Sequence, residues 1–166
     1  AYIRLELEGM IEVRPQSGTY VFQPDKQELL ALCELRVALE LEASRLAMAR
    51  NRDRLGSIFS DTVELMETAI EERSLETYQN LDTGLHLQVL DASQSPLLQS
   101  TYTRQVNGRF AALRYRFSQQ HAHNDASLSE HKAMRDAVLD NDVDGLLKLT
   151  RQHIENTKYY YETAKF

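Results

Sequence analysis

Residues 25–50 read DKQELLALCELRVALELEASRLAMAR, and this stretch decides the fold class. Asp25 and Glu28 have the D-x-x-E spacing of a capping box, which marks the start of a helix. Apolar residues then recur with helical spacing, and one line along this helix carries Leu29, Cys33, Arg36 and Glu40. The stretch therefore predicts a long amphipathic helix that places a cation and an anion on its inward line.

The helical period continues to the end of the chain. Further helices are predicted at 53–73, 74–92, 96–118, 128–140 and 143–161, with a polar loop at 119–126. Pro96 can begin its helix because proline is tolerated in a first turn. The connections are short, which favours antiparallel neighbours. We therefore expect an all-α, antiparallel bundle of six or seven helices over residues 24–166.

Residues 1–23 follow a different pattern. Two short β-prone runs around the turn sequence PQSG at 15–18 predict a β-hairpin over 11–22. Ahead of it, residues 1–8 are predicted to be the end of a helix, with Gly9 in the position of a left-handed cap. A helix stub and one hairpin cannot build a core. This segment either packs on the bundle or is the remnant of a domain whose beginning is missing.

The composition excludes several classes of protein. The 166 residues carry a formal net charge of −6 and are 42% apolar, which fits a soluble globular domain. No apolar run approaches the roughly 20 residues of a membrane-spanning helix, and no signal-peptide pattern is present. The acidic balance argues against nucleic-acid binding by most of this surface. A single cysteine, Cys33, favours a core role and a reducing, cytoplasmic compartment.

Three of the five histidines lie on apolar helix faces. His86 follows Asp82 by four residues, so both side chains project from one face of a helix. His131 and His153 are in line with apolar residues of two other predicted helices. Such residues would be satisfied most simply by sharing one divalent cation. The alternatives are a helix-stabilising Asp82/His86 pair and a metal-free interaction module with histidines in its core.

Other polar and aromatic residues are not assigned to the site. His121 and His123 form an H-x-H pair in the predicted loop and are expected to face solvent. The run Tyr159-Tyr160-Tyr161 suggests a stacking platform. The favoured interpretation is a terminal helix that packs its aromatic edge on the bundle.

Taken together, these segments resemble a known family. The helical part is similar to the effector-binding C-terminal FCD domain of the FadR-type branch of GntR transcription regulators. The matching segments are LCELRVALE at 32–40, DTGLH at 82–86, EH at 130–131 with Ala137 and Asp142 downstream, and RQHI at 151–154. Residues 1–23 resemble the end of that family's winged-helix DNA-binding domain. Ser95 departs from the pattern, which often has Asn before the proline.

The resemblance implies that Asp82, His86, His131 and His153 are metal ligands. Zinc is the most common ion expected on such ligands, with nickel, copper or manganese as alternatives. One carboxylate and three neutral imidazoles around a divalent ion leave a charge of about +1, which attracts a small anion. The implied effector is a small carboxylate such as a hydroxy acid, a dicarboxylate or a sugar acid.

Arginine is the natural partner for such an effector. Arg36 is the best candidate, and its alternative role is a structural pair with Glu40 one turn away. Tyr102, Arg109 and Arg116 are spaced by seven residues and are predicted to share a helix face. Tyr102 and Arg109 are therefore included in the predicted effector site, with a solvated surface as the alternative for the cations.

The resemblance implies a bacterial sensor domain, not an enzyme. Metal and effector would favour one arrangement of the bundle and so bias two winged helices attached to a homodimer. Operator DNA would be contacted only through the front half of the winged helix, which this sequence lacks. The alternative is a metal-dependent hydrolase or lyase. No H-E-x-x-H motif supplies its general base, and on a helix Glu130 points about 100° away from His131.

Overall fold

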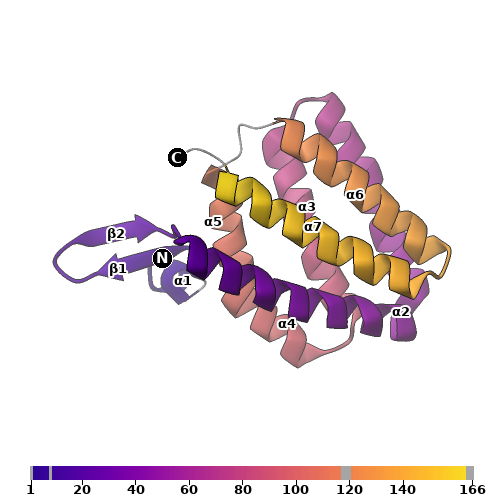
Figure 1. Cartoon of the computed structure of the whole chain (residues 1–166), viewed down its shortest axis with the longest axis horizontal. Coiled ribbons are helices and arrows are strands. Elements are labelled where there is room, and N and C mark those ends of the chain that lie inside the picture. Colours follow the sequence, from indigo (N-terminus) through magenta and orange to yellow (C-terminus); the bar gives the residue numbers. More distant parts are fainter. Residues whose placement is uncertain (1, 8, 117–120, 164–166) are drawn as a thin grey trace.

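Helices and one β-hairpin make up the architecture of the computed structural model (Figure 1). The residues that it describes are 2–7, 9–116 and 121–163. The elements after the hairpin are α2 (Lys26–Glu71), α3 (Leu75–Ala92), α4 (Pro96–Tyr102), the π-helix η1 (Thr103–Asn107), α5 (Gly108–Arg116), α6 (His121–Leu139) and α7 (Val143–Thr163). The predicted all-α fold with a preceding hairpin is confirmed. The helix limits predicted at Ala1, Glu8 and Ser118 lie outside the described residues.

The N-terminal segment has the predicted helix and hairpin. Helix α1 spans Tyr2–Leu7, and strands β1 (Ile11–Arg14) and β2 (Gly18–Val21) pair antiparallel. Gly9 has φ of +70°, the left-handed conformation in which glycine commonly ends a helix. The hairpin projects from the bundle (Figure 1), and Phe22 after it packs against the hydrophobic core.

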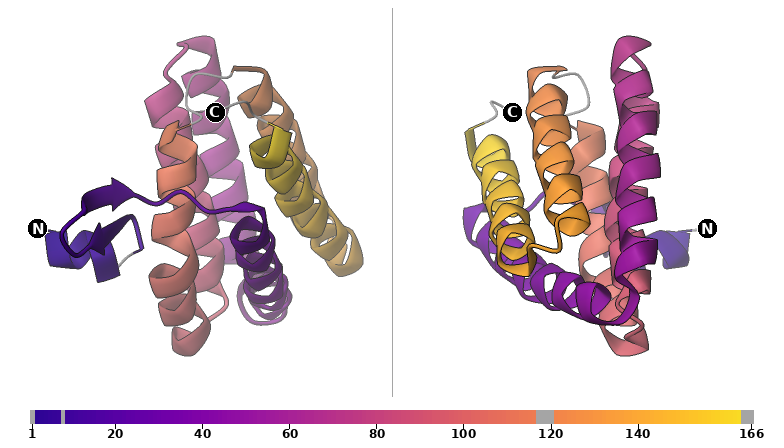
Figure 2. Two further views of the ribbon diagram at one scale, coloured as in Figure 1. Left: turned by 60° about the vertical axis from the view of Figure 1, so that its left-hand side comes forward. Right: turned by 90° about the vertical axis from the view of Figure 1, so that its right-hand side faces the viewer.

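Helix α2 is the longest helix of the bundle. Its capping box is formed: the Asp25 carboxylate accepts from the Glu28 N–H, and the Glu28 carboxylate accepts from the Asp25 N–H. Asn51 has φ −154° and ψ 39°, which are not helical angles. The helix therefore divides in the gap predicted between residues 50 and 53, and its two halves run in different directions (Figure 2).

The bundle closes around α2. This helix contacts α3, α6 and α7, and α6 and α7 also contact each other. The core between them consists mainly of large apolar side chains, among them Leu55, Met66, Leu85, Leu90, Leu146 and Ile154. Within this core, α2, α3, α6 and α7 each turn at least one ionisable side chain inward. Among the described residues, no helix has the length and apolar character needed to span a membrane.

The π-helix η1 changes which residues of the fourth predicted helix face the core. The predicted line Tyr102, Arg109, Arg116 assumes a straight α-helix. A π-turn holds an additional residue, so the faces beyond it are rotated. The inward line instead continues from Tyr102 to Phe110 and Arg114, whereas Arg109 turns toward the N-terminal segment. The side chain of Arg116 lies outside the described part.

The prediction of a loop at 119–126 is wrong for the residues that can be compared. Helix α6 begins at His121, inside that stretch. Asn124 and Ser127 are buried on the same side as His131, and polar residues on an inward face conceal the apolar period that signals a helix. His121 and His123 belong to the start of this helix, but their side chains are outside the described part, as are residues 119 and 120.

Candidate metal and effector site

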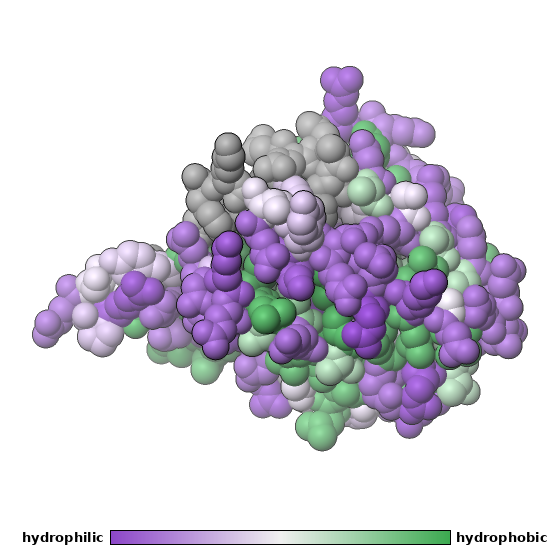
Figure 3. Space-filling model, in the orientation of Figure 1, coloured by the Kyte–Doolittle hydropathy of each residue, from purple (hydrophilic) through white to green (hydrophobic). Residues whose placement is uncertain are grey.

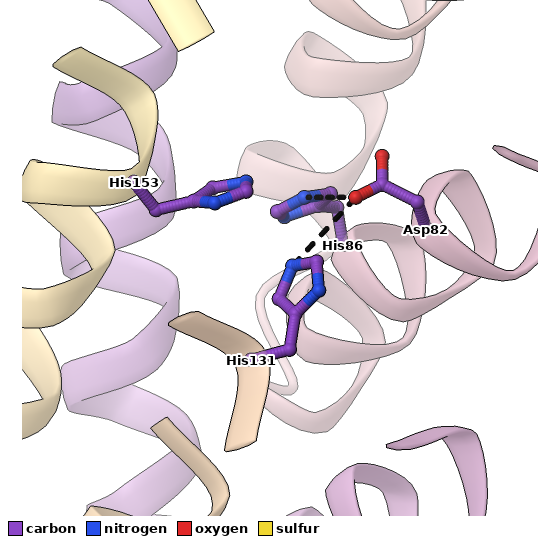
Figure 4. A group of neighbouring side chains, drawn as sticks. All are labelled: Asp82, His86, His131 and His153. Carbon is purple, nitrogen blue, oxygen red and sulfur yellow. Dashed lines mark ion pairs between the residues drawn. The ribbon is translucent and has the colours of Figure 1, made fainter. Parts of the chain in front are cut away.

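Four ligand-type side chains meet inside the bundle. Asp82 and His86 come from α3, His131 from α6 and His153 from α7, and they point toward one another (Figure 4). One potential ligand atom of each lies within 4.8 Å of the others, and all four residues are buried. Two ligands on opposite sides of a metal ion at typical bond lengths are about 4.2 Å apart. The cluster is therefore close to the size of a coordination shell.

His131 gives the clearest sign that the cluster fits a cation. Its side chain is fully buried, and neither ring nitrogen has a hydrogen-bond partner. Its Nε2 lies 3.6 Å from Oδ1 of Asp82, beyond a normal hydrogen bond. Burial, reinforced by the nearby His153, holds the pKa of His131 well below its usual value, so the ring is neutral at pH 7. A neutral imidazole with an unused lone pair is what a divalent ion requires.

His153 is oriented by a carboxylate behind it. Its Nδ1 lies 2.6 Å from Oε2 of Glu130, and the Asn156 amide donates to Oε1 of the same carboxylate at 2.5 Å. Burial lowers the pKa of His153, although the bond to Glu130 opposes this shift. An Nδ1–H bonded to Glu130 leaves Nε2 as the acceptor, the usual arrangement behind a metal-bound histidine. Glu130, next to His131 in the chain, therefore supports His153 on the neighbouring helix.

His86 is held between Glu40 and Arg36. Its Nδ1 lies 2.9 Å from Oε2 of Glu40, and its Nε2 lies 2.8 Å from Nη2 of Arg36. Burial lowers the pKa of His86 and the Glu40 carboxylate raises it, with a net rise. A guanidinium can only donate, however, so the contact with Arg36 requires an unprotonated Nε2. Arg36 therefore uses the same lone pair that a metal ion would use.

Arg36 forms the buried pair with Glu40 that is one of the two roles considered for it from the sequence. Its Nε donates to Oε1 of Glu40 at 2.6 Å, and its guanidinium lies 4.4 Å from the centre of the Phe110 ring. Tyr102 donates to the same Glu40 oxygen at 2.8 Å, so Tyr102 positions Glu40. Although burial raises the pKa of Glu40, Arg36 and His86 outweigh it and hold that pKa below its usual range. Arg36 also lines the cavity described below.

Arg114 is a site residue that the sequence reasoning missed. Its Nε lies 2.7 Å from Oδ2 of Asp82, and its Nη1 donates to the Thr83 hydroxyl at 2.9 Å. Burial raises the pKa of Asp82, but Arg114 lowers it well below the usual value, so Asp82 is ionised. Only the rotation at η1 brings Arg114 inward, and the sequence has no distinct signal for that π-turn.

The structure does not bring Arg109 to the cluster. Its Nη1 donates to the carbonyl of Gln105 at 2.7 Å, and its guanidinium lies 5.7 Å from the centre of the Phe22 ring. Gly9 lies so close to Arg109 that a Cβ atom at this position would contact the same guanidinium. Arg109 therefore packs on the N-terminal segment.

A small cavity adjoins the cluster. Its volume is about 30 Å³, and Arg36, Asp82, Arg114 and His153 contribute to its lining. This space holds about two water molecules. The two guanidinium groups give the cavity the chemistry of an anion site, and the neighbouring ligand cluster gives it a place for a cation. This arrangement has the chemistry to accept a small charged ligand.

The fold is an all-helical bundle with a buried polar site, preceded by a helix and a hairpin. The model of the FCD domain family matches residues 31–156. The chain therefore belongs to the FCD domain family of GntR-type transcriptional regulators.

Relatives agree with this assignment. The HTH-type transcriptional repressor RspR of Escherichia coli K12 is 22% identical over 155 residues, which are 93% of this chain and 68% of the relative. The uncharacterized HTH-type transcriptional regulator YdfH of Shigella flexneri matches over the same shares with the same identity. These relatives are transcriptional regulators and not enzymes, so the hydrolase or lyase alternative has no support.

Solved structures share the fold. Escherichia coli McbR/YncC has a TM-score of 0.83 at 19% identity. The match covers 96% of this chain and 80% of the solved chain. A putative transcriptional regulator GntR from Rhodococcus sp. RHA1 has a TM-score of 0.84 at 12% identity, covering 99% of this chain and 78% of its own. The fold of this chain is therefore shared with these solved structures.

Proposed function

We propose that this chain is the sensor part of a GntR-type regulator, which binds a divalent metal ion together with a small carboxylate effector. The observation that carries the proposal is His131, a fully buried imidazole whose two nitrogens have no hydrogen-bond partner. Leaving such groups unsatisfied costs about 1–3 kcal/mol each, and a shared cation removes that cost. Metal and effector would together select the arrangement of the bundle that the DNA-binding part responds to.

Asp82, His86, His131 and His153 would hold the ion. Zinc is the first candidate on nitrogen and oxygen ligands, and nickel or manganese also suits them. When bound, the ion supplies positive charge and coordination positions for an anionic oxygen. The cavity beside it is lined by Arg36 and Arg114, whose planar forks are suited to a carboxylate. Tyr102 would act by holding Glu40, and Arg109 is left out of the proposed site.

The proposal includes a homodimer in the cytoplasm, with operator DNA contacted through the winged helix whose end residues 1–23 resemble. Leu97 on α4 is 74% exposed, and Leu30 and Leu35 on α2 are also exposed. Hydrophobic side chains gather over α2 and α4 on the otherwise mainly hydrophilic face in Figure 3. We propose this surface as the dimer contact. Light scattering of the wild type and of Leu97→Asp tests it, with a monomeric wild type as the contradicting result.

The metal is tested by elemental analysis of protein purified without chelator. We expect roughly one divalent ion per chain, and loss of most of it in Asp82→Ala or His131→Ala, because each removes a ligand from a small set. Arg109→Ala is the control that keeps the metal, since Arg109 lies away from the cluster. A metal-free wild type at neutral pH would favour a metal-free interaction module.

The effector is tested by thermal melting with a panel of small carboxylates, on metal-loaded and metal-stripped protein. A ligand that binds only the native state raises the melting temperature in proportion to its occupancy. We expect a responsive carboxylate to act only on the loaded protein. An equal increase in both forms would separate the effector from the metal and would contradict the proposed site.

A further inference from the structure

The cavity lining also contains polar side chains that are neither proposed metal ligands nor arginines. Tyr78 of α3 is 2% exposed and Asn124 of α6 is 6% exposed, and both line the cavity. The Tyr78 hydroxyl and the Asn124 amide nitrogen have no hydrogen-bond partner. Ser127, also in the lining, is close enough to act on the pKa of Tyr78 but makes no hydrogen bond of normal geometry with it.

These two groups offer donors. An amide NH2 can only donate, and burial followed by the nearby charge of Asp82 raises the pKa of Tyr78, which keeps the phenol protonated. Buried donors without a partner are rare in folded proteins, and one explanation is a partner that enters from outside. Two such donors on one cavity call for an acceptor oxygen within it.

The charges around the cavity indicate whether the acceptor oxygen that pairs with Tyr78 and Asn124 is charged or neutral. The guanidinium groups in the lining are Arg36 and Arg114, and each is paired with a buried carboxylate, Glu40 and Asp82. The described lining thus offers no further arginine or lysine to Tyr78 and Asn124. A second carboxylate there would be buried without a counter-charge, which is strongly unfavourable. A neutral hydroxyl or carbonyl oxygen is satisfied by neutral donors.

We infer that Tyr78 and Asn124 form a second anchor for the effector and select a compact monocarboxylate that carries a hydroxyl or oxo oxygen. This inference rests on the proposed function and narrows its ligand class. Plain aliphatic acids would leave both donors unpaired, and dicarboxylates would bring an unpaired charge. Because the cavity of about 30 Å³ holds only about two water molecules, lining side chains must move to admit an acid, and this favours short chains.

Calorimetric titration of zinc-loaded protein with matched acids tests the inference. The pairs are lactate with propionate and 3-hydroxybutyrate with butyrate, and succinate serves as the dicarboxylate. The second pair is included because the hydroxyl of an α-hydroxy acid can also reach a metal. For at least one pair we expect the hydroxy acid to bind wild type more tightly. The affinity ratio, which is the affinity of the hydroxy acid divided by that of the plain acid, should fall roughly five- to tenfold in Tyr78→Phe and in Asn124→Ala, because one hydrogen bond is lost. The affinity of the plain acid should not change.

A second measurement separates recognition from a structural role. Tyr78→Phe removes a hydroxyl that has no partner, so the melting temperature of the ligand-free protein should not fall. Thr150→Val is the control: this buried hydroxyl donates to the carbonyl of Leu146 and lies outside the cavity lining, so its loss should leave the affinity ratio unchanged.

Failure of this inference is distinguishable from failure of the proposed function. If plain and hydroxylated acids bind wild type equally, or succinate binds more tightly than either hydroxy acid, the inference alone is overturned. It is also overturned if Tyr78→Phe lowers the melting temperature and keeps the ratio. If none of these acids binds the zinc-loaded protein, both this inference and the proposed carboxylate effector are contradicted.

Discussion

Replacement of Arg36 by alanine is expected to lower the free energy of unfolding by about 3–5 kcal/mol, because it leaves a buried carboxylate without its cation. Glu40 is 2% exposed and lies 2.6 Å from Arg36 Nε. Tyr102 and His86 would still bond to Glu40 but would not supply the same charge. Urea denaturation of the metal-free protein measures the effect.

A surface pair provides the matched control for this prediction. Arg45 lies 2.7 Å from Glu42, with both side chains about half exposed. Arg45→Ala is expected to cost at most about 1 kcal/mol, because exposed pairs are screened by water and salt. Similar losses in the two variants would mean that the buried pair with Glu40 has no special weight in the fold.

The double variant Arg36→Met/Glu40→Gln separates stability from effector binding. It leaves no unpaired charge, and replacing a buried pair by uncharged groups of similar volume is often neutral. Most of the lost stability should therefore return. If Arg36 pairs with the effector, carboxylate affinity should still fall by about 1.5–3 kcal/mol, the range for a hydrogen bond to a charged group. Metal should be retained, since Arg36 donates to the His86 lone pair and is not itself a ligand. Unchanged carboxylate affinity would remove Arg36 from the effector site.

Removal of metal is the second change with a large expected effect. A chelator should lower the melting temperature by roughly 8–16 °C when free metal had been near a thousandfold excess over its dissociation constant. Such an excess stabilises the native state by about 4 kcal/mol, and each kcal/mol is worth about 2–4 °C in a chain of this size. The ion would join α3, α6 and α7 and satisfy His131, contacts that do not exist in the unfolded chain.

Melting curves at mildly alkaline pH, with chelator and after metal is restored, provide the measurement. His131→Ala is the matched control, because a protein without this ligand should respond little to the chelator. An unchanged melting temperature in wild type would mean that no metal stabilises this fold.

The elements of this protein are visible in its sequence because their signals are local. The capping box at Asp25 and Glu28 starts α2, and Gly9 ends the first helix in the left-handed conformation. The spacing of Asp82 and His86 places both on one helix face, and that face is buried. The gathering of four ligand-type residues was predicted from helix faces and from the family resemblance.

Several residues whose role depends on a neighbour from another element were not predicted. Glu130 supports His153 across two helices, and Arg114 reaches Asp82 only because η1 rotates the helix that carries it. Asn124 was placed in a loop because its polarity hides the helical period, yet it is buried in the wall of the cavity.

Periodicity, caps and turn residues act within a few positions along the chain, so the sequence by itself determined most of the helices, the hairpin and the inward ionisable residues of α2, α3, α6 and α7. Pairing depends on distances between side chains far apart in the chain and on the phase of each helix. Only the tertiary structure could therefore decide that Arg36 contacts both Glu40 and His86, that Arg114 and not Arg109 reaches Asp82, and that His131 is left without a hydrogen-bond partner.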